Sequence, residues 1–196
     1  MPRKTSIKKS AVDFTKAADE IANFLSILGN GQSAKHISWL HDYAIIRLYR
    51  EFEALMLDSL AGAINNDLEV FSDVVGVEFP KHLKHKSCEY LIVGTGYFDF
   101  KGKSGLVKTL KKFVPANHYL LTVVKKTKYH QTLEQLSALR NFAAHDSAKS
   151  KKNALRETGQ QRLKSSGTWL KTDNRIRTII SKLKELAAEI ETESPF

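Results

Sequence analysis

The sequence predicts an all-α protein, a helical bundle with a long central insertion and at most one short β-hairpin. Several long stretches place apolar residues three and four positions apart, which is the spacing of one buried helix face. Few stretches show the alternation of a half-buried strand. The 196 residues are 42% hydrophobic and 27% charged, as in globular chains with a sizeable core. We expect one domain over residues 1–196, built from five to seven helices.

Two long helices are expected at the start of the chain. Residues 10–28 repeat apolar side chains at helical spacing, and Ser10 with Asp13 suggests the N-terminal cap. Residues 33–63 carry the longest helical pattern, with no Pro or Gly before Gly62. Its apolar stripe is broad, so this helix should be a central element that packs against several others.

The central insertion is expected over residues 64–103, where Gly and Pro interrupt the pattern. Its segment CEYLIVGTGYFDF has a strand-like composition broken by Gly-Thr-Gly. This favours a helix end followed by an ordered loop, with one short hairpin as the alternative. The Gly-Thr-Gly element lacks the further Gly and the Lys-Thr pair of a phosphate-binding loop, which argues against that function.

Four more helices are predicted in the second half of the chain, and the last of them is amphipathic with Thr172 as its cap. Residues 148–170, which precede it, are mostly polar and basic and contain Gly and Ser breaks. The four predicted helices cover residues 104–115, 117–126, 129–147 and 172–192.

The positive charge is concentrated in one part of the chain. Residues 101–175 hold 17 Lys and Arg against 4 Asp and Glu, whereas the remainder holds 14 against 17. A one-sided basic surface favours a polyanionic partner, with nucleic acid before an anionic membrane. A lysine surface that only keeps the protein soluble is the plain alternative.

The sequence also limits the expected cellular location of the protein. No apolar run is long enough to span a membrane, and the basic start MPRKTSIKKS leads into an amphipathic segment rather than a signal-peptide core. We therefore expect a cytoplasmic protein. The single Cys88 excludes an internal disulfide and is expected to be a small buried hydrophobic residue.

The segment RNFAAHDSAKSKK contains the candidate catalytic residues Arg140, Asn141 and His145. Residues four apart on a helix lie about 40° apart around its axis, so Asn141 and His145 share a face. Arg140 is about 140° from His145, although its long side chain has the reach to turn back. The intervening alanines leave room for another helix or a ligand.

These residue types match the needs of RNA cleavage without a metal. A 2′-hydroxyl must lose a proton, the leaving oxygen must gain one, and the phosphorane must be stabilised by a cation. His supplies the proton transfers near neutral pH, and Arg presents a planar fork to phosphate oxygens. One His and one Arg are few for a complete site, so a homodimer that shares one cleft is expected.

RNFAAH resembles the signature of the HEPN superfamily, in which four to six residues separate an Arg from a His. Two further segments, LYREFEALM (48–56) and GYFDFKGKSGLVKTLKKF (96–113), are similar to one branch, the RiboL-PSP-type HEPN domains. With residues 133–152 these segments span nearly the whole chain in the expected order. The resemblance implies an all-α homodimer with metal-independent endoribonuclease activity, in a toxin–antitoxin or phage-defence setting with a possible antitoxin protein.

The resemblance also implies roles for particular residues. Arg140 and His145 match the catalytic pair, and Asn141 matches the supporting polar position. Glu53 and Arg50 on the long helix are candidates to face the pair. HEPN toxins controlled by nucleotidyltransferases often carry a Tyr two residues after the His, where Ser147 stands here, so control by tyrosine modification is not expected.

Five lysines are candidate RNA contacts because of their place beside the predicted site or on a basic helix. A solvated tail is the alternative for those that follow His145. They are Lys149, Lys151, Lys152, Lys111 and Lys112.

Several other side chains have two interpretations. His82 and His85 stand three apart as metal ligands do, but we find no acidic or Cys partner at ligand spacing and expect a solvated basic turn without metal. Tyr97, Phe98 and Phe100 suit stacking on RNA bases, and anchoring of their loop to the core is favoured over stacking. No cofactor is expected.

The alternative to an enzyme is a catalytically inactive helical module that binds RNA or a partner protein through the same groove. A membrane-surface or DNA-binding protein would need a recognition-helix pattern that the sequence does not contain.

Overall fold

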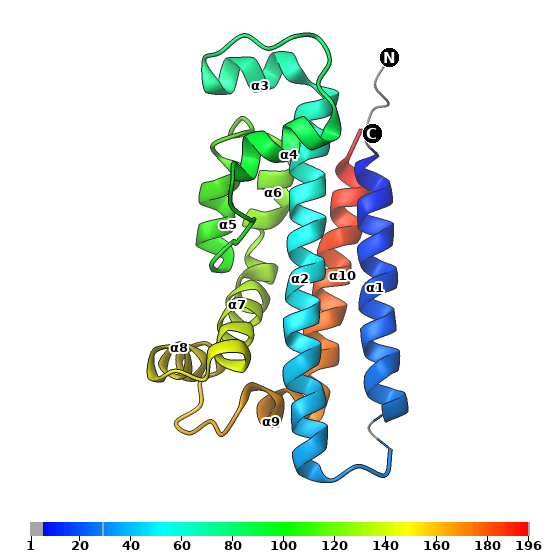
Figure 1. The fold of residues 1–196 in the computed structure, drawn as a ribbon, viewed down its shortest axis with the longest axis vertical. Coiled ribbons are helices and arrows are strands. Elements are labelled where there is room, and N and C mark those ends of the chain that lie inside the picture. Colours follow the sequence, from blue (N-terminus) through cyan, green and yellow to red (C-terminus); the bar gives the residue numbers. More distant parts are fainter. Residues whose placement is uncertain (1–5, 29, 196) are drawn as a thin grey trace.

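Three long helices run side by side along the molecule in the computed structural model, which describes residues 6–28 and 30–195 (Figure 1). They are α1 (Ile7–Leu28), α2 (Ala34–Asn66) and α10 (Arg175–Glu193). At about 1.5 Å per residue, the 33 residues of α2 extend for about 50 Å. The all-α prediction is confirmed, and no strand or hairpin occurs within the described residues.

The shorter helices pack on the side of α2 that is opposite α1 (Figure 1). Helix α2 contacts α1, α4, α7, α9 and α10, which confirms its prediction as a central element. Three helices, α4, α7 and α9, therefore bring segments that are distant in sequence to α2. The bounds of the shorter helices are α3 (Leu68–Val75), α4 (His85–Val93), α5 (Gly102–Leu110), α6 (Tyr119–Lys125), α7 (His130–His145), α8 (Ala148–Thr158) and α9 (Ser166–Lys171).

The region expected to be irregular, residues 64–103, contains α3, which was not predicted. The helix end predicted over CEYLIV and the ordered loop after it are confirmed. Helix α3 is capped by Asp67, whose side chain accepts a hydrogen bond from the N–H of Val70. The strand-like residues CEYLIV lie in α4, where Cys88 is fully buried in a small second core with Leu68 and Phe71. Packing against α2 therefore overrides the local strand preference of this segment.

The polar stretch after the Arg140 segment also forms helices, α8 and α9, so more helices are present than the five to seven expected. Ser147 caps α8 in a reciprocal arrangement with Ser150, which satisfies two N–H groups at the helix start. Helix α7 ends at His145, two residues before the predicted end, because Asp146 adopts a left-handed conformation with φ 38°. The chain thus turns sharply between α7 and α8.

Two predicted caps are wrong. Ser10 lies inside α1, which begins at Ile7, because Ile7 is fully buried and extends the apolar face by one turn. Thr172 belongs to a short 3₁₀ turn, Thr172–Asn174, and α10 begins at Arg175. Both errors concern where a helix starts and leave its buried face unchanged.

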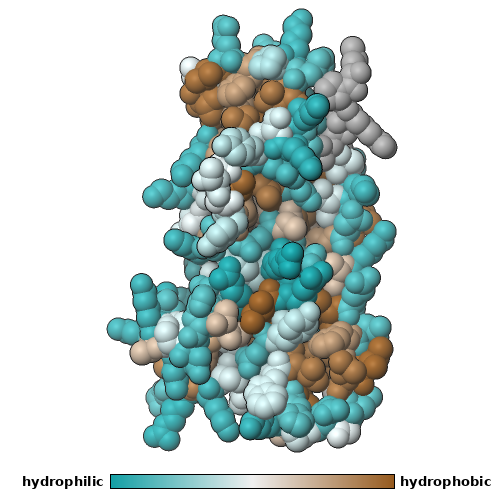
Figure 2. All heavy atoms as spheres, viewed as in Figure 1, coloured by the Kyte–Doolittle hydropathy of each residue, from teal (hydrophilic) through white to brown (hydrophobic). Residues whose placement is uncertain are grey.

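Hydrophobic and hydrophilic side chains gather on different parts of the surface. Figure 2 shows hydrophobic side chains exposed over α3 and near the α1–α2 turn, where Ile27 and Leu28 lie. Hydrophilic side chains cover the part of this face where α8 lies. Within the described residues, no helix combines the length and the apolar composition needed to cross a membrane.

Candidate functional site

Helix α2 supplies the floor of the site. Tyr49 and Glu53 lie four positions apart on α2 and so face the same direction, toward α7. The Tyr49 ring is buried and stacks on Phe100, with ring centroids 4.7 Å apart and 16° between the planes. Phe100 in turn meets Phe52 edge to face at 5.3 Å. This aromatic packing fixes the position of the Tyr49 ring.

The segment before α5 adds an acidic side chain to the floor. Phe98 and Phe100 are buried, and Asp99 between them faces outward, as alternating residues of an extended segment do. Their burial confirms that these two Phe residues anchor the loop, whereas Tyr97 is 89% exposed. The Tyr49 hydroxyl donates a hydrogen bond of 2.7 Å to Asp99 Oδ1.

Close packing of α5 holds this segment in place. Gly102 has φ +76°, and a Cβ there would collide with the Glu134 carboxylate of α7, which accepts a hydrogen bond from the N–H of Lys103. A Cβ at Gly105 would collide with the carbonyl oxygen of Phe100. Glycine at both positions therefore allows the Asp99 segment to lie against α7 and α2.

Arg140 of α7 lies above this floor. Its guanidinium carbon is 3.9 Å from the centroid of the Tyr49 ring, a stacked cation–π contact. Nη2 is 3.8 Å from Glu53 Oε1 and 3.7 Å from Asp99 Oδ1, and Nη1 donates a 2.8 Å hydrogen bond to Asn141 Oδ1. The side chain is 21% exposed, so one part of the guanidinium still faces solvent.

Glu53 has a perturbed pKa in its position beside Arg140. Burial raises the pKa of Glu53 from 4.5 to about 7, although the positive Arg140 opposes this rise and the negative Asp99 adds to it. Glu53 Oε1 is buried without a hydrogen-bond partner among the described residues, since Arg140 stands beyond hydrogen-bond distance. Burial and the bond to Asp99 also raise the pKa of Tyr49, which therefore stays a neutral donor.

His145 does not join this cluster within one chain. It is the last residue of α7, it is exposed, and it forms no hydrogen bond or ion pair with residues 6–28 or 30–195. The predicted shared face with Asn141 follows from the helix geometry, but Asn141 turns to Arg140 and His145 projects from the helix end. The structure thus brings together Arg140, Asn141 and Glu53, and leaves His145 beside them.

The other predicted residues lie outside the cluster. Arg50 is exposed on α2 and has no ion pair in the described part of the chain. Lys111 and Lys112 follow the end of α5, about 14 Å from its start at Gly102. They therefore form a separate basic area rather than an edge of the Arg140 cluster.

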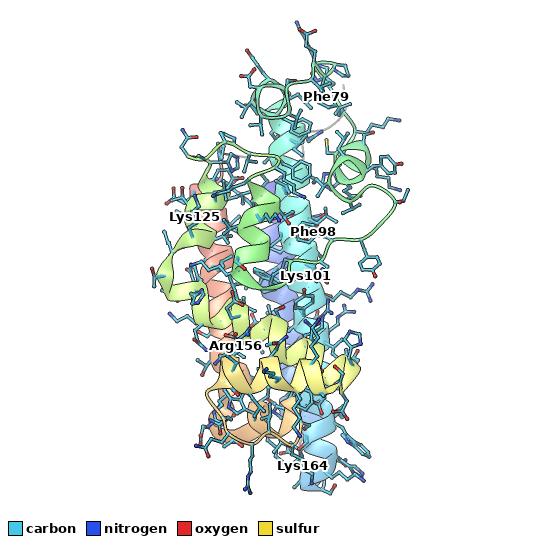
Figure 3. The ribbon with its side chains drawn as sticks, turned by 90° about the vertical axis from the view of Figure 1, so that its left-hand side faces the viewer. Phe79, Phe98, Lys101, Lys125, Arg156 and Lys164 are labelled. Carbon is cyan, nitrogen blue, oxygen red and sulfur yellow. The ribbon has the colours of Figure 1, made fainter. Side chains whose placement is uncertain are left out.

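Exposed basic side chains lie on α8 and at the start of α5. Lys149, Lys151 and Lys152 are exposed on α8 and form no ion pair with any described residue. Figure 3 looks onto this side of the molecule, with Lys101 at the start of α5, Arg156 on α8 and Lys164 beyond it. Since Ser147 caps α8, its hydroxyl is engaged in the turn that connects the Arg140 helix to these lysines.

Two residues of the cluster, Tyr49 and Asp99, were not among the predicted site residues. The spacing of Tyr49 and Glu53 on one helix was the available signal for the first. Asp99 stands between two phenylalanines in YFDF, a pattern that places it on the opposite side from a buried pair. Its meeting with Arg140, 41 positions later in the chain, required the fold.

The arrangement offers a partly exposed guanidinium on a rigid aromatic and acidic floor, next to a carboxyl group that titrates near neutral pH. Such a cation suits a phosphate, and such a carboxyl group suits proton transfer. In comparisons with known proteins, no family model, curated protein or solved structure matches the chain.

Proposed function

We propose that the protein is a metal-independent endoribonuclease of the HEPN type, with a composite site formed by two copies of the chain. The observation that carries this proposal is the Arg140 guanidinium, stacked on Tyr49, facing Glu53 and open to solvent on one side. The basic surface of α8, which follows His145 directly, supports an anionic substrate.

In this mechanism the 2′-hydroxyl of RNA attacks the adjacent phosphorus atom and the 5′-oxygen leaves. His145 serves as a proton donor or acceptor, and Arg140 stabilises the extra negative charge on the phosphorane oxygens. Asn141 orients the guanidinium through its 2.8 Å hydrogen bond. Glu53 positions Arg140 and supplies a second group that titrates near neutral pH.

The need for two copies follows from the separation of Arg140 and His145. They lie five residues apart on α7 and do not touch, so one chain presents the cation and the imidazole in different directions. Two copies related by a two-fold axis would place a second His145 against the first Arg140.

RNA and a second copy are thus the proposed partners, and the proposed setting is toxin–antitoxin or phage defence. An antitoxin would have to act at the cleft or the basic surface. Tyrosine modification is not available at position 147, where the Ser147 hydroxyl caps α8.

The test is incubation of purified protein with mixed RNA in EDTA. We expect cleavage that leaves 2′,3′-cyclic phosphate ends, with losses of about 10²- to 10⁴-fold in His145→Ala and in Arg140→Ala. His130→Ala, an exposed histidine at the start of the same helix, is the matched control and should retain activity. Cleavage that survives His145→Ala would overturn the mechanism.

A mixture of the two inactive variants tests the composite site. A heterodimer of Arg140→Ala with His145→Ala keeps one Arg and one His in a shared cleft, so cleavage should rise about 10-fold or more above either variant alone. Salt-dependent RNA binding without any cleavage would instead indicate the inactive RNA-binding module.

A further inference from the structure

A second polar cluster lies between α2 and α4, away from the Arg140 cluster. His85 is the first residue of α4, Glu89 follows it by one helical turn, and Asp58 faces them from α2. Helix α4 packs directly on α2 (Figure 1). The sequence-based expectation that His85 has no acidic partner is therefore wrong, because Glu89 stands four residues away and the fold adds Asp58.

The three side chains converge on one point. His85 Nε2 is 3.0 Å from Glu89 Oε1 and 3.6 Å from Asp58 Oδ1, and the three ligand atoms all lie within 4.8 Å of one another. Ligand atoms about 2.1 Å from a metal ion are separated by about 3.0 Å in octahedral and about 3.4 Å in tetrahedral geometry. The two distances to His85 are close to these values.

The donor set is one imidazole nitrogen and two carboxylate oxygens, which suits first-row divalent ions and Zn²⁺ in particular. The side chains of His85, Asp58 and Glu89 are 28%, 43% and 33% exposed, so an ion has a path from solvent and water can complete its coordination. Asp13 of α1 also interacts electrostatically with Asp58, and it lies 3.9 Å from Lys9.

We propose that Asp58, His85 and Glu89 bind a divalent transition-metal ion, with Zn²⁺ the preferred one. The ion would take the place of the direct contacts between the imidazole and the two carboxylates. Asp58 lies five residues beyond Glu53, so the two side chains point about 140° apart around α2. The ion is therefore separate from the Arg140 chemistry.

The expected role of the ion is to fasten the start of α4 to α2. Apart from the ion, α3 and α4 are held by apolar packing in the minor core around Cys88 and Phe71. Helix α4 leads into the segment that carries Asp99, so its attachment also restrains one wall of the Arg140 cluster. The metal site itself does not depend on the proposed ribonuclease function.

The test is calorimetric titration of chelator-treated protein with Zn²⁺, together with thermal melting. We expect one equivalent of tightly bound Zn²⁺ and a higher melting temperature with the ion than without it. The isosteric variants Asp58→Asn and Glu89→Gln should each weaken binding about 10- to 100-fold, and His85→Ala should weaken it at least as much. His82→Ala, an exposed histidine three residues before His85, should bind as the unaltered chain does.

Co²⁺ gives an independent signal, because a tetrahedral or five-coordinate site with a nitrogen ligand produces visible absorption that Zn²⁺ should displace. If a variant does not fold, nitrogen NMR of the unaltered chain decides, since Zn²⁺ should shift His85 Nε2 and leave His82 unchanged. The absence of stoichiometric binding, or binding that all three variants retain, would overturn the proposal. These measurements do not involve RNA cleavage, so their failure is distinct from failure of the proposed function.

Discussion

Arg140 and His145 stand five residues apart on one helix, yet their surroundings are opposite. Arg140 is fixed by an aromatic ring, two carboxylates and an amide. His145 is exposed at the helix end and has no ion-pair or hydrogen-bond partner in the described part of the chain. The fold of a single chain thus positions Arg140, whereas the exposed imidazole of His145 can contact another molecule.

Because of this difference, substitutions of Arg140 and His145 should differ in their effects on protein stability. Removing a half-buried cation leaves Glu53 and Asp99 facing each other without compensation, whereas removing an exposed imidazole leaves nothing unsatisfied. If both residues serve the same reaction, the two substitutions should have similar effects on cleavage and different effects on unfolding.

The largest expected difference is therefore between Arg140→Ala and His145→Ala in urea unfolding. We expect Arg140→Ala to lower the free energy of unfolding by about 1–3 kcal/mol and His145→Ala to change it by about 0.5 kcal/mol or less. Arg140→Lys should recover part of the loss, since it keeps the charge without the planar fork. Equal destabilisation by both alanine variants would contradict the comparison.

Glu53→Gln tests the surroundings of Arg140 through the pH dependence of the free energy of unfolding. Since burial raises the pKa of Glu53 to about 7, the folded protein binds more protons than the unfolded chain between pH 4.5 and about 7. Stability should therefore fall as pH rises through this window. Glu53→Gln should flatten that fall in urea unfolding measured at several pH values, and the exposed Glu20→Gln on α1 should not. An unchanged slope in Glu53→Gln would show that this carboxyl group titrates normally.

The lysines that follow His145 test whether its side of the helix meets RNA. Replacing Lys149, Lys151 and Lys152 together with Gln should reduce the slope of log affinity against log salt by about 2 for single-stranded RNA. Replacing Lys8, Lys9 and Lys16 of α1 is the control with the same charge change. Equal slopes for the two triple variants would remove α8 from the binding surface.

The smallest expected effect concerns the turn between α7 and α8. Ser147→Ala removes the cap of α8 and should cost about 1 kcal/mol in urea unfolding, with a larger relative loss of amide protection in α8. The exposed Ser181→Ala on α10 should have no such effect. If amide protection in α8 is unchanged, packing rather than capping holds this helix.

The long helices were predictable because each repeats its apolar residues over several turns. Among the short helices, α5, α6 and the end of α4 were predicted, whereas α3, α8 and α9 were not. A helix of 6 to 11 residues has little periodic signal, so its formation depends on caps and packing. Ser147 and Asp67 show how a single capping side chain decides whether such a segment becomes helical.

Some residues of the candidate site could likewise be predicted from the sequence, and others could not. Arg140 and Asn141 were predicted from residue chemistry, helix geometry and the family resemblance, and Glu53 was predicted from the resemblance alone. Asp99 and the meeting of His85 with Asp58 could not be predicted, because Arg140 and Asp58 are distant in sequence from these residues and the fold brings them together.

Three properties could be predicted from the amino-acid sequence alone: the all-α class, the central place of α2 and the concentration of basic charge in one part of the chain. Helical periodicity and composition are local properties, so they can be read without a fold. Only the tertiary structure decided that Arg140 rests on Tyr49 between Glu53 and Asp99, and that Asp58 meets His85 and Glu89. In both clusters, side chains from other elements meet side chains of α2. The packing of those elements on α2, rather than the local secondary-structure preference of each segment, brings them together.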